Sequence, residues 1–377
     1  MSINSQFSSG NIELVGDIEA RPIALKIKAD NQSEFRQWFH FKVNNALNQS
    51  LSFAIVDADK TAYPDGWVDY QVCASYDGQS WFRIPTEYAE GELRFQMDFE
   101  ESSAYFAYFA PYSYERHLDL IHDAAQHEWV THQVLGETLD GREMNLLSVG
   151  DAAAPIQAWV IARQHPGESM AEWFMEGFIG RLLDHDDAVA RKLLQQVRFH
   201  LVPNMNPDGT ERGHLRTNAK GINLNREWNR AQLDNSPEVL LVQQQMQQTG
   251  VDLFLDVHGD EGLPYNFVAG SEGVPRFDKT MAQWEQDFVA AFKATTPEFQ
   301  DEYGYPKDAP GQADLSIASS WVAETFGCLA LTLEMPFKDN ANLPDPLTGW
   351  SSDRSALLGQ AVLQPILAHV EKHLINQ

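Results

Sequence analysis

A histidine and a glutamate three residues apart, in the sequence His165-Pro-Gly-Glu168, have the side-chain types and spacing to bind one metal ion. They stand between an apolar run that predicts a buried strand, 157–162, and a predicted helix, 169–183. An imidazole and a carboxylate, with a second histidine from elsewhere in the chain, form one of the usual ligand sets of catalytic zinc and leave a fourth position for water. The tetrapeptide alone is also compatible with two solvated polar residues at the start of a helix.

Polar residues follow three further apolar runs: Asn204, His258 and Glu334. Open α/β sheets place their sites at the carboxyl ends of strands, so we expect these residues to converge with His165. His258 would complete the ligand set, although a core histidine bonded to the backbone would give the same pattern. Glu334 is interpreted as a general base that takes a proton from the attacking water and passes it to the leaving amine. A strand-end glutamate that simply reaches solvent is the alternative.

Basic residues are concentrated between positions 206 and 228 of this acidic chain, namely Arg212, Arg216, Lys220 and Arg226. A guanidinium group can bind a carboxylate through two parallel hydrogen bonds. The segment could therefore hold an acidic group of a substrate. Arginines more commonly pair with surface acids, and that is what we expect of Arg212.

The elements that would position these residues change character near residue 110. Before it, apolar and polar residues alternate along four segments, and Asp77-Gly78 predicts a hairpin, so an antiparallel β-sandwich is expected. After it, continuous apolar runs alternate with helical segments, which predicts an α/β domain with a sheet covered on both faces. The alternating segments are 39–43, 51–55, 68–72 and 93–99; the later strands are expected at 144–149, 158–162, 197–202, 251–257 and 329–333, and the helices at about 115–126, 169–184, 236–249, 277–293, 315–326 and 352–374.

The composition narrows the class of protein. A length of 377 residues, 43% of them hydrophobic, favours two globular domains. The chain has 27 basic and 54 acidic residues, a net charge of −27, which argues against nucleic acid or an anionic membrane as a partner. Cys73 and Cys328 would lie in different domains, so no disulfide is expected. Neither a signal peptide nor a transmembrane helix is predicted, and the expected location is the cytoplasm.

The motifs together resemble those of a known family. In order along the chain they are His165-Pro-Gly-Glu168, Asn206-Pro-Asp-Gly209, Arg216, Leu224-Asn-Arg226, Asp256-Val-His-Gly259 and Leu333-Glu334. This order is similar to that of the zinc metallocarboxypeptidases of the carboxypeptidase A superfamily, and residues 37–114 resemble the N-terminal β-sandwich of its cytosolic carboxypeptidase subgroup. The resemblance implies a β-sandwich domain at 1–112, and a catalytic domain at 113–377 with a mixed, mostly parallel sheet flanked by helices.

The resemblance also assigns roles to single residues. One zinc ion would be held by His165, Glu168 and His258. Asn225 and Arg226 would bind the substrate's C-terminal carboxylate. Arg216 would stabilise the oxyanion, and Glu334 would act as the general base. Each role agrees with the chemistry of its side chain, because fixed positive charge stabilises negative charge that develops during the reaction.

Two positions depart from the family pattern. Asn223 stands where carboxypeptidase A has an aspartate that orients a zinc-bound histidine, and a neutral amide would raise the basicity of that ligand less. The mobile tyrosine of many relatives has no counterpart at the expected spacing; Tyr303 and Tyr305 are the nearest tyrosines. Relatives often favour acidic C-terminal residues, for which Lys307 and Arg163 are possible basic partners.

The sequence therefore predicts a zinc-dependent metallocarboxypeptidase whose substrate is the C-terminus of a peptide or protein. Two alternatives stay open at this point. One is a zinc amidohydrolase or deacylase that acts on amino-acid conjugates or cell-wall-type peptides with the same site. The other is a non-catalytic binding module that kept the fold.

Overall fold

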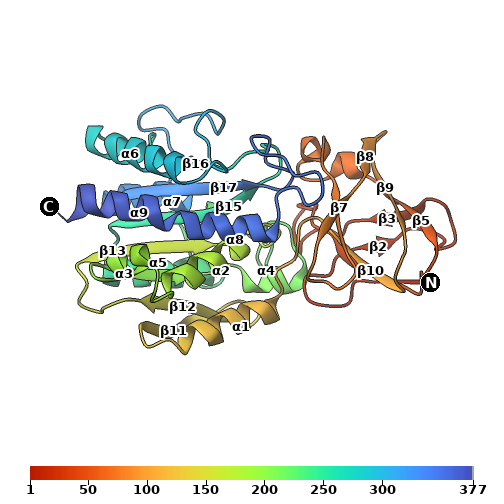
Figure 1. Cartoon of the computed structure of the whole chain (residues 1–377), viewed down its shortest axis with the longest axis horizontal. Helices are drawn as coiled ribbons and strands as arrows, with labels where there is room; N and C mark the ends of the chain where they lie inside the picture. The colour runs from red at the N-terminus through yellow and green to blue at the C-terminus, as the bar shows by residue number, and fades with distance from the viewer. Residues whose placement is uncertain (376–377) are drawn as a thin grey trace.

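The computed structural model describes residues 1–375, and the molecule has two parts arranged along its long axis (Figure 1). The N-terminal part holds ten strands within the described residues: β1 (Ser2–Asn4), β2 (Glu13–Leu14), β3 (Ile23–Lys26), β4 (His40–Asn44), β5 (Ser50–Ile55), β6 (Val72–Ser75), β7 (Phe82–Ile84), β8 (Thr86–Ala89), β9 (Glu92–Asp98) and β10 (Ser103–Ala107). They form two sheets, β1-β4-β10-β6-β7 and β2-β3-β5-β9-β8. All neighbours are antiparallel except β3 and β5, so the antiparallel sandwich is confirmed.

Aromatic side chains from the inner faces of the two sheets fill the sandwich. The rings of Phe41 and Phe106 stack at 5.2 Å, and so do those of Phe53 and Phe95. Each of these residues occupies one of the alternate, inward-facing positions of its strand, as the period-two pattern predicted. The predicted strand at 68–72 is wrong, because a turn of 3₁₀ helix at Pro64–Trp67 delays pairing until β6 begins.

The second part is built on one mixed sheet. Its strands are β11 (Val130–Glu137), β12 (Glu143–Val149), β13 (Ile156–Ala162), β14 (Val197–Val202), β15 (Leu253–Asp260), β16 (Phe267–Ala269) and β17 (Leu329–Pro336). Their order is β11-β12-β14-β13-β15-β17-β16. The four central strands, β14, β13, β15 and β17, are mutually parallel. The strands toward both edges, β11 and β12 on one side and β16 on the other, pair antiparallel. Buried residues run continuously along the central strands because helices cover both faces.

The helices agree with most of the predicted ranges. They are α1 (Tyr114–Ala125), α2 (Met170–Leu182), α3 (Ala188–Leu194), α4 (Pro207–Arg212), α5 (Pro237–Thr249), α6 (Lys279–Thr295), α7 (Ala318–Phe326), α8 (Ser352–Ala361) and α9 (Leu363–His369). The predicted helix at 352–374 is divided at Val362, with a π-helical turn at Val370–Leu374. Helices α2 and α8 touch backbone to backbone, because a Cβ at Gly177 or Gly359 would overlap the opposite helix. No helix among the described residues is long and apolar enough to cross a membrane.

The two parts share a packed boundary. Tyr108 of the sandwich stacks on Phe337 with ring centroids 4.4 Å apart, and Arg83 donates hydrogen bonds to the carbonyls of Phe337 (2.7 Å) and Trp350 (3.2 Å). One continuous cluster of buried apolar side chains extends from the sandwich into the sheet of the second part. The sandwich therefore lies in a fixed position against the carboxyl edge of that sheet. The division at residues 112 and 113 stays a prediction.

Candidate functional site

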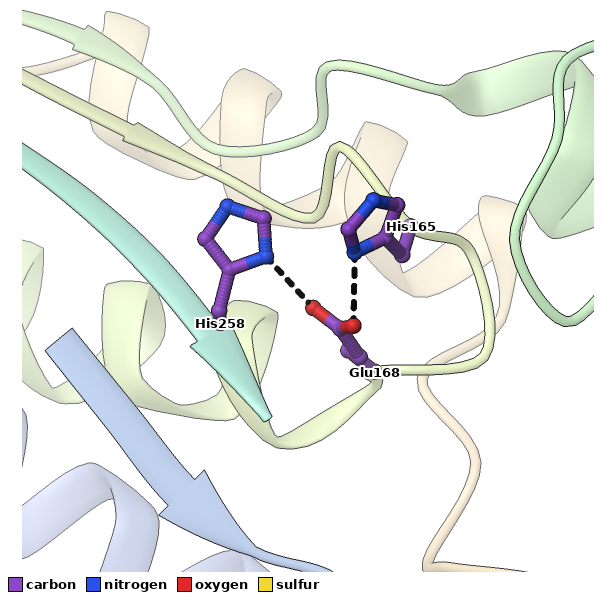
Figure 2. Close-up of side chains that lie close together, drawn as sticks. All are labelled: His165, Glu168 and His258. Atoms are coloured by element: carbon purple, nitrogen blue, oxygen red, sulfur yellow. Dashed lines mark hydrogen bonds and ion pairs between the residues drawn. The ribbon is translucent and has the colours of Figure 1, made fainter. Parts of the chain in front are cut away.

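The three predicted metal ligands come together at the carboxyl edge of the sheet. His165 lies on the loop after β13, Glu168 lies just before α2, and His258 lies on β15. Both imidazoles point at the Glu168 carboxylate (Figure 2): His165 Nδ1 is 2.6 Å from Oε1, and His258 Nδ1 is 2.8 Å from Oε2. The three donor atoms lie within 4.8 Å of one another, and all three side chains are buried.

The donor set fits a zinc ion. Two imidazole nitrogens and one carboxylate oxygen are a usual set of protein ligands for catalytic zinc. Burial, helped by the charge of Arg216, lowers the pKa of His165 to about 4, so this ring is neutral at neutral pH and has a free lone pair. Burial alone would raise the pKa of Glu168, but the two histidines outweigh it and hold that pKa below its ordinary value. Glu168 is therefore an ionised oxygen donor.

The loop that carries His165 is supported by a buried arginine. Arg163 has a left-handed backbone (φ 58°), and its guanidinium donates to the carbonyls of Pro166 (3.0 Å) and Tyr112 (2.7 Å) and to the Glu172 carboxylate (2.6 Å). These partners belong to the interior of the protein, and the Arg163 side chain is fully buried. The suggestion that Arg163 meets an acidic substrate is therefore wrong, because this buried residue supports the loop that carries the predicted ligand His165.

The outer hydrogen bonds of the two histidines differ. His165 Nε2 lies 3.0 Å from the amide oxygen of Asn223, as the sequence predicted for this neutral neighbour. His258 Nε2 lies 2.9 Å from Oδ2 of Asp256, which also accepts a bond from Gln164 Nε2 at 2.7 Å. The carboxylate partner therefore belongs to His258 and not to His165. The sequence could have indicated this pair, since Asp256 and His258 are two residues apart on one strand and so point to the same face.

The predicted base closes the same site. Glu334 is next to His258 in the parallel register of β15 and β17 and is 6% exposed. Its Oε2 has no hydrogen-bond partner in the part of the chain that the structure describes. Burial raises the pKa of Glu334 well above its ordinary value; the charge of His258 partly opposes this, and that of Glu168 adds to it. A carboxylate in this setting is ready to accept a proton.

The predicted substrate-binding residues line a cleft of about 1010 Å³ together with the metal ligands and Glu334. Asn225 is fixed by the bond from the Ala318 N–H to its side-chain oxygen (2.8 Å), and Arg226 Nη1 donates to the Asn225 carbonyl (2.6 Å). Arg212 lies outside this group and pairs with Asp140 at 2.7 Å, as predicted. The arginine-rich segment therefore divides into one surface pair and two residues in the cleft, Arg216 and Arg226.

The sandwich holds Arg216 in place. Asp30 accepts hydrogen bonds from the backbone N–H groups of Leu215 (2.7 Å), Arg216 (2.8 Å) and Thr217 (2.9 Å). The Arg216 guanidinium lies over the rings of Phe35 (5.6 Å) and Tyr63 (5.4 Å). Sequence reasoning missed these contacts, because about 185 residues separate Asp30 from the loop it binds and no local pattern links them.

The two candidate tyrosines have different surroundings. Tyr305 lines the cleft and donates a hydrogen bond from its hydroxyl to Asp260 Oδ2 at 2.6 Å. Tyr303 stacks on Tyr265 with ring centroids 4.5 Å apart and is not among the cleft-lining residues. Lys307 also lines the cleft, where its ammonium pairs with Glu272.

Comparison with known families accounts for both parts of the chain. Residues 3–109 match the cytosolic carboxypeptidase N-terminal domain, and residues 114–350 match the zinc carboxypeptidases. The chain belongs to the zinc carboxypeptidase family. Human cytosolic carboxypeptidase 6 is 29% identical in an alignment of 325 positions that covers 75% of this chain and 63% of the human protein.

Two solved bacterial structures resemble the whole chain. A metallo-carboxypeptidase from Burkholderia cenocepacia has 47% identity and a TM-score of 0.96, with 98% of this chain and 99% of that chain covered. A metallo-carboxypeptidase from Pseudomonas aeruginosa, in complex with (2-guanidinoethylmercapto)succinic acid, has 48% identity and a TM-score of 0.96 at the same coverage. The prediction of a metallocarboxypeptidase is confirmed, and the deacylase alternative is not favoured.

Asp256 gives a test of the metal site of this carboxypeptidase. Asp256→Asn is expected to weaken zinc binding by about 10- to 100-fold, because a charged partner makes a histidine ligand more basic and fixes its orientation. A competition titration against a chromophoric chelator measures the affinity. Asn223→Asp is the matched control, and it should bind zinc at least as tightly as the wild type. An unchanged affinity in Asp256→Asn would show that its charge does not act on the metal.

Proposed function

We propose that this metallocarboxypeptidase binds one zinc ion through His165, Glu168 and His258 and hydrolyses the last peptide bond of a peptide or protein. The observation that carries the proposal is the convergence of the donor set, the unpartnered Glu334 oxygen and two arginines on one cleft. The match to the cytosolic carboxypeptidase N-terminal domain supports the cytoplasm as its location.

The protein's own groups would share the reaction as follows. Zinc, when bound, supplies a Lewis acid that polarises the scissile carbonyl and acidifies water. Glu334 removes a proton from the attacking water and delivers it to the nitrogen of the leaving residue, so the proton is conserved. Arg216 donates hydrogen bonds to the carbonyl oxygen as negative charge develops on it.

Asn225 and Arg226 would restrict the enzyme to free C-termini. Arg226 presents a guanidinium that matches a carboxylate, and Asn225 is held beside it by the start of α7. The succinic acid group of the molecule bound to the Pseudomonas relative carries carboxylates, which is the chemistry that these two side chains suit. The substrate would thus be anchored at one end of the cleft by its terminal carboxylate.

The proposal predicts a strong preference for a free C-terminus. A peptide and its C-terminal amide should differ by about 10²-fold or more in kcat/KM, because the amide leaves the buried polar groups of the site unpaired. Release of the last amino acid, followed by chromatography over a series of C-terminal residues, measures the difference. N-acyl amino acids serve as the comparison, and faster cleavage of these than of any peptide would contradict the proposal.

A further inference from the structure

The sandwich forms one wall of the active-site cleft, and this wall faces a buried acidic residue. Residues 62–66 of the sandwich line the cleft opposite the segment that follows β15, which includes Glu261. The contact is close, since a Cβ at Gly66 would lie 3.1 Å from the Cβ of Glu261. Glu261 therefore lies at the boundary between the two parts of the molecule.

Glu261 is an acidic residue of the cleft that is almost fully buried and whose carboxylate has no partner on another described residue. It is 6% exposed, and within residues 1–375 no hydrogen bond or ion pair joins its side chain to another residue. By contrast, Asp260 accepts bonds from Tyr305 and from the backbone N–H of Gly262, and Glu272 pairs with Lys307. A buried carboxylate is stable as an ion only when it is paired.

The surroundings of Glu261 do not supply that partner. Burial, followed by the charge of Glu168, raises the pKa of Glu261 well above its ordinary value, and the nearby Arg216 only partly opposes this. Arg216 does not pair with Glu261: its guanidinium lies over two sandwich rings, and no ion pair joins the two side chains within the described residues. A cation that entered the cleft would therefore meet an acidic side chain that is 6% exposed and has no partner on another described residue.

The proximity of Arg216 to both Arg226 and Glu261 indicates which part of a substrate would meet Glu261. Arg216 lies within electrostatic reach of both Arg226 and Glu261. In the proposed function, Arg226 holds the terminal carboxylate and Arg216 faces the scissile carbonyl. A peptide bound in this way extends past Arg216 toward the sandwich wall, so the residue before the scissile bond approaches Glu261.

We propose that Glu261 is a subsite for a cationic group, an ammonium or a guanidinium, on the residue that precedes the scissile bond. The inference rests on the proposed function, because that function fixes the direction of the peptide. The cation could come from a lysine or arginine side chain, or from the free α-amino group of a dipeptide. In both cases the substrate supplies the partner that Glu261 lacks.

The test uses the full-length zinc enzyme and two pairs of peptides that end in the same well-cleaved residue. The first pair is N-acetylated and has lysine or the uncharged norleucine before the scissile bond. The second pair consists of dipeptides with norleucine, either free or acetylated at the N-terminus. The wild type is expected to favour the charged member of at least one pair by about 10- to 100-fold in kcat/KM. The pair that responds identifies the source of the cation.

Variants assign the preference to Glu261. Glu261→Gln should abolish the preference and leave kcat/KM for the neutral peptides within about twofold. Asp65→Asn removes an exposed acid of the same wall and should reduce the preference far less, because salt and water screen it. Equal losses on charged and neutral peptides in Glu261→Gln would mean that the residue acts through Arg216, and the proposal would be overturned.

Binding to a Glu334→Gln enzyme separates this proposal from the hydrolytic mechanism. Calorimetry on that variant should show the same preference for the charged peptide without turnover. If the wild type cleaves all four peptides at one rate and the variant binds them with one affinity, the subsite does not exist although the carboxypeptidase function stands. If no peptide is cleaved but the charged one binds more tightly, the proposed reaction fails and the subsite stands.

Discussion

Glu334→Gln is expected to lower kcat by about 10²- to 10⁴-fold while zinc binding is retained. Glutamine has the shape of glutamate and cannot accept the proton of the attacking water, so the chemical step loses its base. Glu334 is not one of the three clustered donors, which are His165, Glu168 and His258, so the metal should stay bound. Steady-state rates on a good peptide substrate and the zinc content of the purified variant measure the two outcomes.

The matched control is a buried glutamate away from the cleft. Glu238, on α5, is fully buried, and burial raises its pKa to about 8, yet its carboxylate bonds to Asn218 and does not line the cleft. Glu238→Gln should leave kcat within about twofold of the wild type. Full activity in Glu334→Gln with zinc bound would exclude Glu334 as the base. A loss of activity together with zinc would mean that the variant had damaged the metal site instead.

The convergence of the site could be predicted because it follows from one rule of architecture. His165 follows a parallel strand, and His258 and Glu334 lie two residues before the ends of theirs; such ends meet at one edge of a sheet. Continuous apolar runs marked the central strands well. The edge strands β11 and β16 escaped prediction, because one is largely exposed and the other has only three residues.

The contribution of the sandwich could not be predicted from the sequence. Tyr63 and Gly66 line the cleft, and Asp30 binds the loop that carries Arg216, through tertiary packing between segments that lie far apart in the chain. Periodicity describes which face of a strand is buried, and it does not say what another domain places against the site. The lack of a partner for Glu261 could not be predicted either, because it depends on which side chains the tertiary fold places around this residue.

Arg216→Met is expected to lower kcat by about 10²- to 10³-fold with little change in KM. Methionine keeps much of the side-chain volume and can still pack between Phe35 and Tyr63, but it has no donor for the oxygen of the scissile carbonyl. Because that oxygen gains its charge mainly in the transition state, the loss should fall on the chemical step. Full progress curves over a range of peptide concentrations give kcat and KM separately.

Arg226→Met is the matched comparison, and its effect should fall mainly on KM, because a terminal carboxylate is charged in the free substrate as well as in the transition state. Asp30→Asn tests whether the sandwich positions Arg216: it removes the charge that receives three backbone N–H bonds and should lower kcat by a smaller factor than Arg216→Met. Combined with Arg216→Met, it should add little further loss, since both changes act on one group. Additive losses in the double variant would mean that Asp30 acts on turnover by a route other than Arg216.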